Sequence, residues 1–172
     1  MQQLYRGIIT ENAVAATPII TVNAEDADTN KSVIYSLEGK QELLQLIKIN
    51  HKTGEVVVSE RIDRERYSWI NVTVRATDTG FPPLTGSALL SIQVLDENDN
   101  NPVFVGEQRQ SFVIAEDAPI GSLVAQISAR DEDSGVFGKI TYLLDSSSTF
   151  GKFKIDRETV FTYFVLNIEI KI

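Results

Sequence analysis

The chain has 172 residues, enough for one or two small domains, and it contains no cysteine, so no disulfide can stabilise them. Its formal net charge of −8 argues against nucleic acid and anionic membrane surfaces as partners, because both would repel it. No apolar run approaches the roughly 18 residues of a transmembrane helix, and Met1 to Arg6 lack the apolar core of a signal peptide. We therefore expect a piece cut from a longer protein.

Residues 8 to 95 predict short β-strands separated by turns. Residues 67–78 give the clearest signal, because Ile70, Val72 and Val74 alternate with polar residues, as in a strand with one buried face. Residues 40–48 are the one place where a helical turn is credible, since Gln, Glu and Leu dominate there. Further strands are predicted within residues 8–22, 32–37, 56–58 and 88–95. Short strands with regular turns predict an antiparallel β-sandwich.

Residues 96–104 read Asp-Glu-Asn-Asp-Asn-Asn-Pro-Val-Phe and place three carboxylates and three carboxamides in six residues. Such oxygen-only side chains suit a hard cation, because Ca²⁺ takes about 6 to 8 oxygen ligands. The alternative is a solvated polar linker. Two further carboxylate pairs, Asp63 with Glu65 and Asp131 with Asp133, flank this stretch and favour the metal site.

The second half of the chain repeats the first. Glu11 and Glu116 are separated by 105 residues, and Asp26 and Asp131 are separated by the same 105 residues. A constant offset indicates a tandem repeat. We expect units at residues 1–98 and 99–172, joined by a linker at residues 96–102.

The second unit departs from the repeat after Tyr142. Asp156 follows Tyr142 by 14 residues, whereas Asp63 follows Tyr35 by 28, so Asp156 and Glu158 are not predicted as ligands. Residues 153–156 instead match the strand at 47–50. Residues 161–172 match no part of the first unit, although their even positions alternate as in a strand. We therefore expect an incomplete second unit that lacks its final strands.

These motifs resemble those of the extracellular repeats of cadherins, and the resemblance covers nearly the whole chain. Residues 96–102 resemble the family's DxNDNxP linker, residues 63–65 its DRE motif, residues 131–133 its DxD motif, and Glu11 the glutamate that opens a repeat. The resemblance implies an all-β fold of two tandem Greek-key, immunoglobulin-like β-sandwich repeats. It also implies about three Ca²⁺ ions at each complete linker.

Carried over residue by residue, the resemblance implies a ligand set drawn from both repeats. The two ions nearer the first repeat would be held by Glu11, Asp63, Glu65, Asp96 and Asp99, with the backbone carbonyl of Glu97. The ion nearer the second repeat would be held by Asn98, Asp131, Asp133 and the carbonyl of Asn100. The strand that would supply a further late aspartate in the second repeat is missing, so we expect weak binding of the outer ion.

Three other acids match ligands of a linker that would precede the first repeat: Asp26, Asp28 and Asp78. We interpret them as a sign that this repeat is internal in its parent, the alternative being ordinary turn acids. Some cadherins adhere through an N-terminal strand bearing a tryptophan, but the only tryptophan is Trp69. The resemblance is therefore to protocadherin-like cadherins with many repeats. Asn30 and Asn71 begin N-glycosylation sequons, which weakly indicate the secretory route.

Catalysis is disfavoured, since the chain has a single histidine, His51, beside a predicted turn, and no cysteine nucleophile or Gly-rich phosphate loop. The resemblance implies calcium-dependent cell–cell adhesion by the extracellular side of a membrane-anchored protein. Its partners would be other cadherin ectodomains, bound homophilically or heterophilically, in cis or in trans. Two alternatives stay open: a calcium-stiffened secreted or bacterial surface adhesin, and a calcium-independent immunoglobulin-like binding module.

Overall fold

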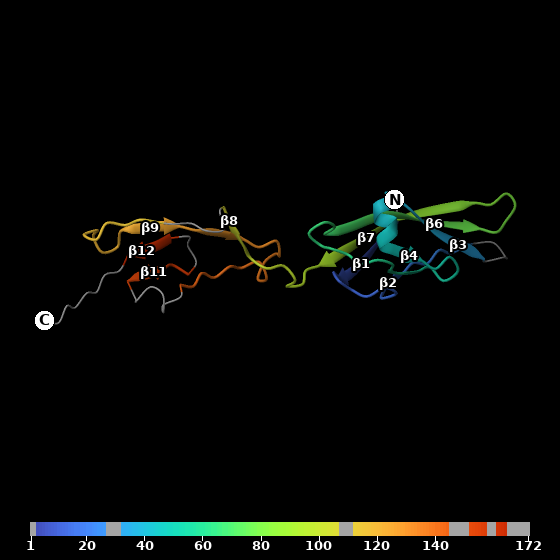
Figure 1. Cartoon of the computed structure of the whole chain (residues 1–172). Helices are drawn as coiled ribbons and strands as arrows, with labels where there is room; N and C mark the ends of the chain where they lie inside the picture. Colours follow the sequence, from blue (N-terminus) through green and yellow to red (C-terminus); the bar gives the residue numbers. More distant parts are fainter. Residues whose placement is uncertain (1–2, 27–31, 107–111, 145–151, 158–160, 165–172) are drawn as a thin grey trace. The chain divides into compact units, whose positions relative to one another are not determined.

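The computed structural model describes residues 3–26, 32–106, 112–144, 152–157 and 161–164. The chain divides into two compact units, Met1–Glu97 and Asn98–Ile172. Strands dominate both, and the single described α-helix is short (Figure 1). No helix among the described residues has the length and apolar character needed to cross a membrane.

The first unit contains a four-stranded sheet whose order is β1-β7-β6-β3. Its strands are β1 (Gln3–Thr10), β3 (Val33–Glu38), β6 (Trp69–Asp78) and β7 (Thr85–Leu95). β6 pairs antiparallel with both β3 and β7, whereas β1 pairs parallel with β7 from Gln3 opposite Ala88 to Thr10 opposite Leu95. β1 begins five residues before the predicted strand at Ile8, because this pairing with a distant strand extends it.

A second, three-stranded sheet of order β2-β5-β4 completes the first unit. It consists of β2 (Pro18–Thr21), β4 (Ile47–Ile49) and β5 (Glu55–Val58), paired antiparallel. Helix α1 (Gln41–Leu46) lies between β3 and β4 in the chain and confirms the predicted helical turn. Both sheets contribute to one core, which makes this unit a β-sandwich.

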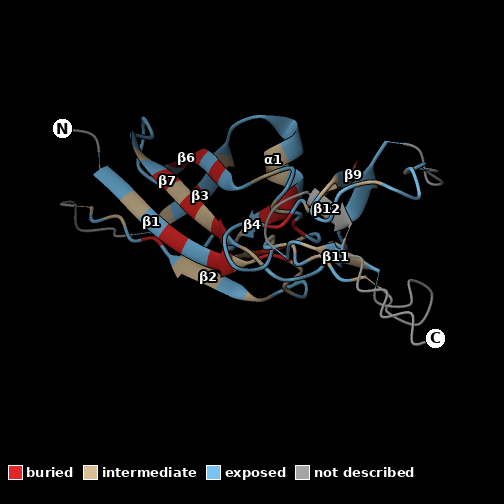
Figure 2. Ribbon diagram, turned by 90° about the vertical axis from the view of Figure 1, so that its left-hand side faces the viewer, coloured by how far each residue is buried: buried red, intermediate tan, exposed pale blue. Residues whose placement is uncertain are grey.

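The core is built from alternating positions of the strands. Ile70, Val72 and Val74 of β6 are 0%, 3% and 4% exposed, as their spacing predicts. Leu90 and Ile92 of β7 lie opposite Val72 and Ile70 in the register and are also buried. Buried and exposed positions alternate along β1, β6 and β7 (Figure 2). This alternation fixes which side chains face solvent on the outer side of the sheet.

The second unit has two small sheets in its described part. One pairs β8 (Val103–Val105) with β10 (Ser128–Arg130), and the other has the order β11-β12-β9, from β9 (Leu123–Gln126), β11 (Phe153–Ile155) and β12 (Phe161–Phe164). This second order matches β4-β5-β2 of the first unit. The assignment of residues 153–156 to the position of β4 is thereby supported.

β12 corrects one expectation. Residues 161–172 were expected to match no part of the first unit, yet residues 161–164 take the place of β5, between the counterparts of β4 and β2. The side-chain pattern of residues 161–172 could not reveal the place of β12 in the sheet, because that place is defined by backbone pairing with β9 and β11. Among the described residues, no strand takes the places of β6 and β7, and Ala125 is the only buried hydrophobic side chain of this unit.

One hydrogen bond is repeated in both units and supports the tandem repeat. In the first unit the backbone N–H of Ala24 donates to the hydroxyl of Tyr35 across 2.9 Å. In the second unit the N–H of Ala129 donates to the hydroxyl of Tyr142 at the same distance. Ala24 and Ala129 are separated by the 105 residues of the repeat offset.

Candidate metal centre

Glu11 is a buried carboxylate at the end of β1, with only 1% of its surface exposed. Its Oε1 accepts a hydrogen bond from the backbone N–H of Glu97 at 2.8 Å, and its Oε2 accepts one from the N–H of Arg64 at 2.9 Å. Its own N–H donates to the carbonyl of Leu95 at 2.9 Å. Glu11 is thus held by two chain segments, residues 95–97 and Arg64, and the two bonds to its carboxylate offset the cost of burying its charge.

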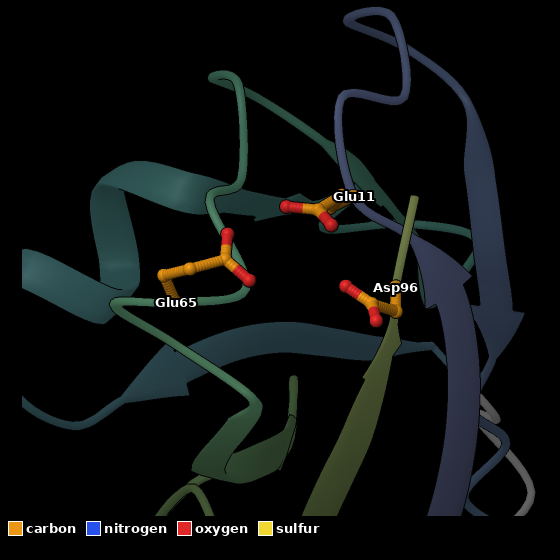
Figure 3. Close-up of side chains that lie close together, drawn as sticks. All are labelled: Glu11, Glu65 and Asp96. Atoms are coloured by element: carbon orange, nitrogen blue, oxygen red, sulfur yellow. The ribbon is translucent and has the colours of Figure 1, made fainter. Parts of the chain in front are cut away.

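Two further carboxylates converge on Glu11. Glu65 lies in the turn after β5, and Asp96 follows the last residue of β7. One ligand oxygen from each of these three residues lies within 4.8 Å of the other two, and the carboxylates point toward one another (Figure 3). Together they form the acidic cluster, a set of oxygen ligands of the kind that Ca²⁺ prefers.

Arg64 places a positive charge inside the acidic cluster. Its Nε donates to Asp96 Oδ1 at 2.6 Å, its Nη2 donates to Glu65 Oε1 at 2.5 Å, and its Nε is 4.0 Å from Glu11 Oε1. Its side chain is 15% exposed. Sequence reasoning assigned Arg64 no role, although its place between two predicted ligands was a usable signal.

The carboxylates of the acidic cluster repel one another. Burial raises the pKa of the Glu65 carboxyl and the neighbouring charge of Glu11 raises it further, which outweighs the lowering by its backbone hydrogen bond and by Arg64. Burial lowers the pKa of Arg64, but the hydrogen bond and charge of Asp96, aided by Glu65, outweigh this and raise it. A divalent cation would relieve the repulsion, so the residues present fit Ca²⁺.

Asp63 and Glu97 are close in sequence to members of the acidic cluster but do not belong to it. Asp63 is exposed, and its Oδ1 accepts a hydrogen bond from the N–H of Arg66 at 3.2 Å. The carboxylate of Glu97 accepts a hydrogen bond from Asn12 Nδ2 at 3.2 Å. The ligand predicted from Glu97 is its backbone carbonyl, which this bond does not involve. Within the described part of the chain, neither belongs to a group of three acids close enough to share a metal ion.

The predicted ligands of the second unit form a separate hydrogen-bonded set. Asp133 is 7% exposed and accepts from Asn100 Nδ2 at 2.8 Å and from the N–H of Asn100 at 3.4 Å. Asn100 Nδ2 also donates to Asp99 Oδ1 at 3.0 Å, and the N–H of Asp133 donates to Asp131 Oδ1 at 3.0 Å. Asn98 is exposed. Asp133 therefore organises this set.

The acids predicted for an upstream linker are partly described. Asp26 and Asp78 line the same hollow of about 290 Å³ at one end of the first unit. Asp78 Oδ1 also accepts from the N–H groups of Gly80 and Leu84, each at 3.0 Å, which orders the turn after β6. Asp28 and the sequon asparagine Asn30 lie outside the described residues. Asn71 is described and is exposed on β6.

Comparison with known proteins shows the family of the chain. The model of the cadherin domain matches residues 5–95 and 110–169. The chain belongs to the cadherin family. Cadherin repeats are adhesion modules and not enzymes, so the prediction that the chain is not an enzyme is confirmed.

The similar proteins within this family include protocadherins and cadherin-23. It is 36% identical over 182 residues to protocadherin alpha-9 of Mus musculus, covering 96% of this chain and 18% of that protein. The crystal structure of repeats EC22–24 of mouse cadherin-23 matches with a TM-score of 0.84 and 30% identity over 97% of this chain and 52% of that one. The EC3–6 cis-dimer structure of protocadherin gammaB7 matches with a TM-score of 0.84 and 25% identity over 99% and 44%. The chain thus spans less than a fifth of protocadherin alpha-9.

The family assignment confirms the predicted all-β fold of two cadherin repeats. The resemblance to protocadherin-like cadherins is confirmed as well. Calcium binding is a general property of cadherin domains.

Proposed function

We propose that this chain is a calcium-rigidified part of a cadherin ectodomain that acts in cell–cell adhesion, on the extracellular side of a membrane-anchored parent. The observation that carries the proposal is the acidic cluster, in which the oxygens of Glu11, Glu65 and Asp96 lie within 4.8 Å of one another around a buried carboxylate. Three like charges at this separation need positive charge to remain together.

The first predicted set would hold Ca²⁺ through Glu11, Glu65 and Asp96 of the first unit, together with Asp63, the carbonyl of Glu97 and the linker residue Asp99. The second predicted set would hold it through Asn98, Asp131, Asp133 and the carbonyl of Asn100. Bound ions would supply the positive charge that the two acidic sets need, and the sets would supply the oxygen ligands. Glu11 contributes a fixed anchor, because two backbone N–H groups already orient its carboxylate.

Mechanical stiffness follows from where these ligands lie in the chain. The residues from Asp96 to Asn100 are consecutive and belong to the segment joining the repeats, so ordering them removes backbone freedom from that segment. We propose about three Ca²⁺ ions at a complete linker. Asp26, Asp28 and Asp78 would serve an equivalent linker upstream.

The partners we propose are other cadherin ectodomains, engaged homophilically or heterophilically. The likeness to a protocadherin solved as a cis-dimer supports contacts in cis, and contacts in trans follow from the adhesive role. As a part of a longer ectodomain, this chain would serve as a spacer that carries load between adhesive repeats.

Thermal unfolding in millimolar Ca²⁺ and in excess chelator tests the proposal, together with protease cleavage within residues 96–102. We expect a higher melting temperature and protection of the linker in Ca²⁺, because a ligand that binds only the folded state stabilises it. An Asp117→Asn variant, which removes an exposed acid elsewhere, should keep the full calcium response. Equal melting and equal cleavage in both conditions would leave a calcium-independent sandwich and reject the proposal.

A further inference from the structure

The outer face of the four-stranded sheet of the first unit is rich in exposed apolar side chains. Leu4 and Leu89 are directly opposite each other on β1 and β7 and are 47% and 43% exposed. Ile8 of β1 and Trp69 of β6 both lie opposite Gln93 of β7 and are 60% and 50% exposed. This outer apolar face therefore consists of two rows across the sheet: Leu4 beside Leu89 in one, and Ile8 and Trp69 on either side of Gln93 in the other.

Asn71, the acceptor of the sequon Asn71-Val72-Thr73, lies between these two rows, and Thr73 lies opposite Leu89 in the first of them. In the register Asn71 pairs with Ser91, which pairs with Arg6, and this polar row separates the row of Leu4 from the row of Ile8. Since side chains alternate along a strand, Trp69, Asn71 and Thr73 share the outer face, while Ile70 and Val72 are buried. The acceptor asparagine thus lies next to the exposed indole, two residues away on the same face.

We propose that Asn71 carries an N-linked glycan whose first sugar packs against Trp69 and whose chain covers the outer apolar face. The inference rests on the proposed extracellular location, which exposes the chain to the glycosylation machinery. An N-acetylglucosamine ring presents C–H groups on its faces, so it can bury the flat apolar surface of an indole while its hydroxyls stay hydrated. Trp69 supplies such a surface, held by the pairing of β6 with β7.

The modification is a group transfer from a lipid-diphosphate-linked oligosaccharide, catalysed by an oligosaccharyltransferase. A bond forms between the amide nitrogen of Asn71 and C1 of the first sugar, and the bond from C1 to the diphosphate oxygen breaks. The amide nitrogen loses one proton, and the lipid diphosphate leaves with the electron pair of the broken bond. No oxidation or reduction takes place.

Secretion of the full 172-residue chain from eukaryotic cells, behind a cleavable signal peptide, tests the proposal independently of its natural location. Four variants separate sequon chemistry from other effects: Thr73→Ala abolishes the Asn71 sequon, Thr73→Ser keeps it, Asn71→Gln removes the acceptor, and Asn30→Gln removes the other sequon. Peptide mass spectrometry reports occupancy. We expect a glycan at Asn71 in the Thr73→Ser and Asn30→Gln chains and none there in the other two.

Contact between sugar and indole is read from Trp69 itself, because it is the only tryptophan in the chain. An endoglycosidase that leaves one N-acetylglucosamine provides the minimal adduct. We expect the acrylamide quenching constant of the adduct to be about half that of the Thr73→Ala chain, since one face of the ring is covered. Its emission should also shift to shorter wavelength.

Three results would overturn the proposal: an unmodified Asn71 in the folded, secreted Thr73→Ser chain; a modified Asn71 with unchanged quenching of Trp69; and a glycosylated chain that dimerises with Trp69 shielded by the second copy. The calcium dependence of the melting temperature, measured on the same samples, reports on the proposed function separately. Its loss with the Trp69 effect intact would count against the calcium site alone.

Discussion

Arg64 Nε and Asp96 Oδ1 are joined by a 2.6 Å charged hydrogen bond at the centre of the acidic cluster. The guanidinium also bonds Glu65, so one side chain offsets part of the repulsion among three carboxylates. Arg64 therefore has two opposite consequences for a bound cation. It keeps the ligands together when no ion is present, and it competes with the ion for the same oxygens.

Replacing Arg64 by glutamine should separate these two consequences. Without Ca²⁺ we expect a loss of about 2 kcal/mol in the free energy of unfolding, because hydrogen bonds to charged groups are lost. In calcium titrations we expect affinity to rise by about tenfold, or about 1.4 kcal/mol, because a competing charge is removed. Urea unfolding in chelator and calcium titration by calorimetry measure the two effects.

Arg75 offers the matched control for Arg64. Its Nη1 is 3.1 Å from Glu38 Oε1, and both side chains are half exposed, so Arg75→Gln should change the free energy of unfolding by less than about 1 kcal/mol. It should leave calcium affinity unchanged. If Arg64→Gln weakened calcium binding, Arg64 would be a support for the ligands and not a competitor.

Glu65→Gln should affect the calcium-bound and calcium-free states differently. The raised pKa of Glu65 means that its ionised form is less favourable in the folded chain than in the unfolded chain. Removing the charge should therefore leave the melting temperature in chelator unchanged or slightly higher, while the rise produced by Ca²⁺ becomes smaller. Differential scanning calorimetry in both conditions checks this, and an equal drop in both would indicate a packing role alone.

Asp133→Ala tests the hydrogen-bonded set of the second unit. It removes the acceptor of both bonds from Asn100 and leaves partly buried donors unsatisfied, which should cost about 1 to 3 kcal/mol locally. Faster hydrogen exchange at the N–H of Asn100 measures the loss. Glu132→Gln, at an exposed neighbouring position, is the control. Unchanged hydrogen exchange at the N–H of Asn100 in Asp133→Ala would contradict the role assigned to Asp133.

Ile70→Ala should destabilise the first unit by about 2 to 5 kcal/mol, because it leaves a cavity at a fully buried position. The same loss is expected with and without Ca²⁺, since Ile70 lies in the core between the sheets. Urea unfolding of the variant and of Ile8→Ala, at an exposed position of β1, measures the contrast. A comparable loss at Ile8 would mean that the outer face is buried in the folded protein.

The alternation of apolar and polar residues in the sequence correctly predicted which side chains of β6 are buried in the core. The spacing of Ile70, Val72 and Val74 was sufficient to orient β6, because a strand has only two faces. The early start of β1 at Gln3 and the place of β12 could not be predicted in this way. Both depend on hydrogen bonds to strands distant in the sequence, whose register leaves no local signature.

In the candidate site, too, the sequence predicted some features, while others depend on the folded structure. Residue types predicted the oxygen ligands Glu65 and Asp96, the resemblance to cadherins added Glu11, and all three assignments stay predictions until an ion is measured. The place of Arg64 within the acidic cluster depends on how its side chain turns after folding, which composition does not encode. Asp63 lies outside the acidic cluster, although Glu65 two residues later belongs to it, and its Oδ1 instead accepts a hydrogen bond from the N–H of Arg66.

The parallel pairing of β1 with β7 determines how the first unit responds to tension. The chain enters this unit through β1 and leaves it through β7, and these strands run in the same direction over eight paired positions. Pulling the two ends apart therefore loads all hydrogen bonds of this ladder at once, in shear, and does not open them one after another like a zipper. We therefore expect the first unit to withstand a pull on its ends until the whole β1–β7 ladder breaks, with these two strands as a mechanical clamp.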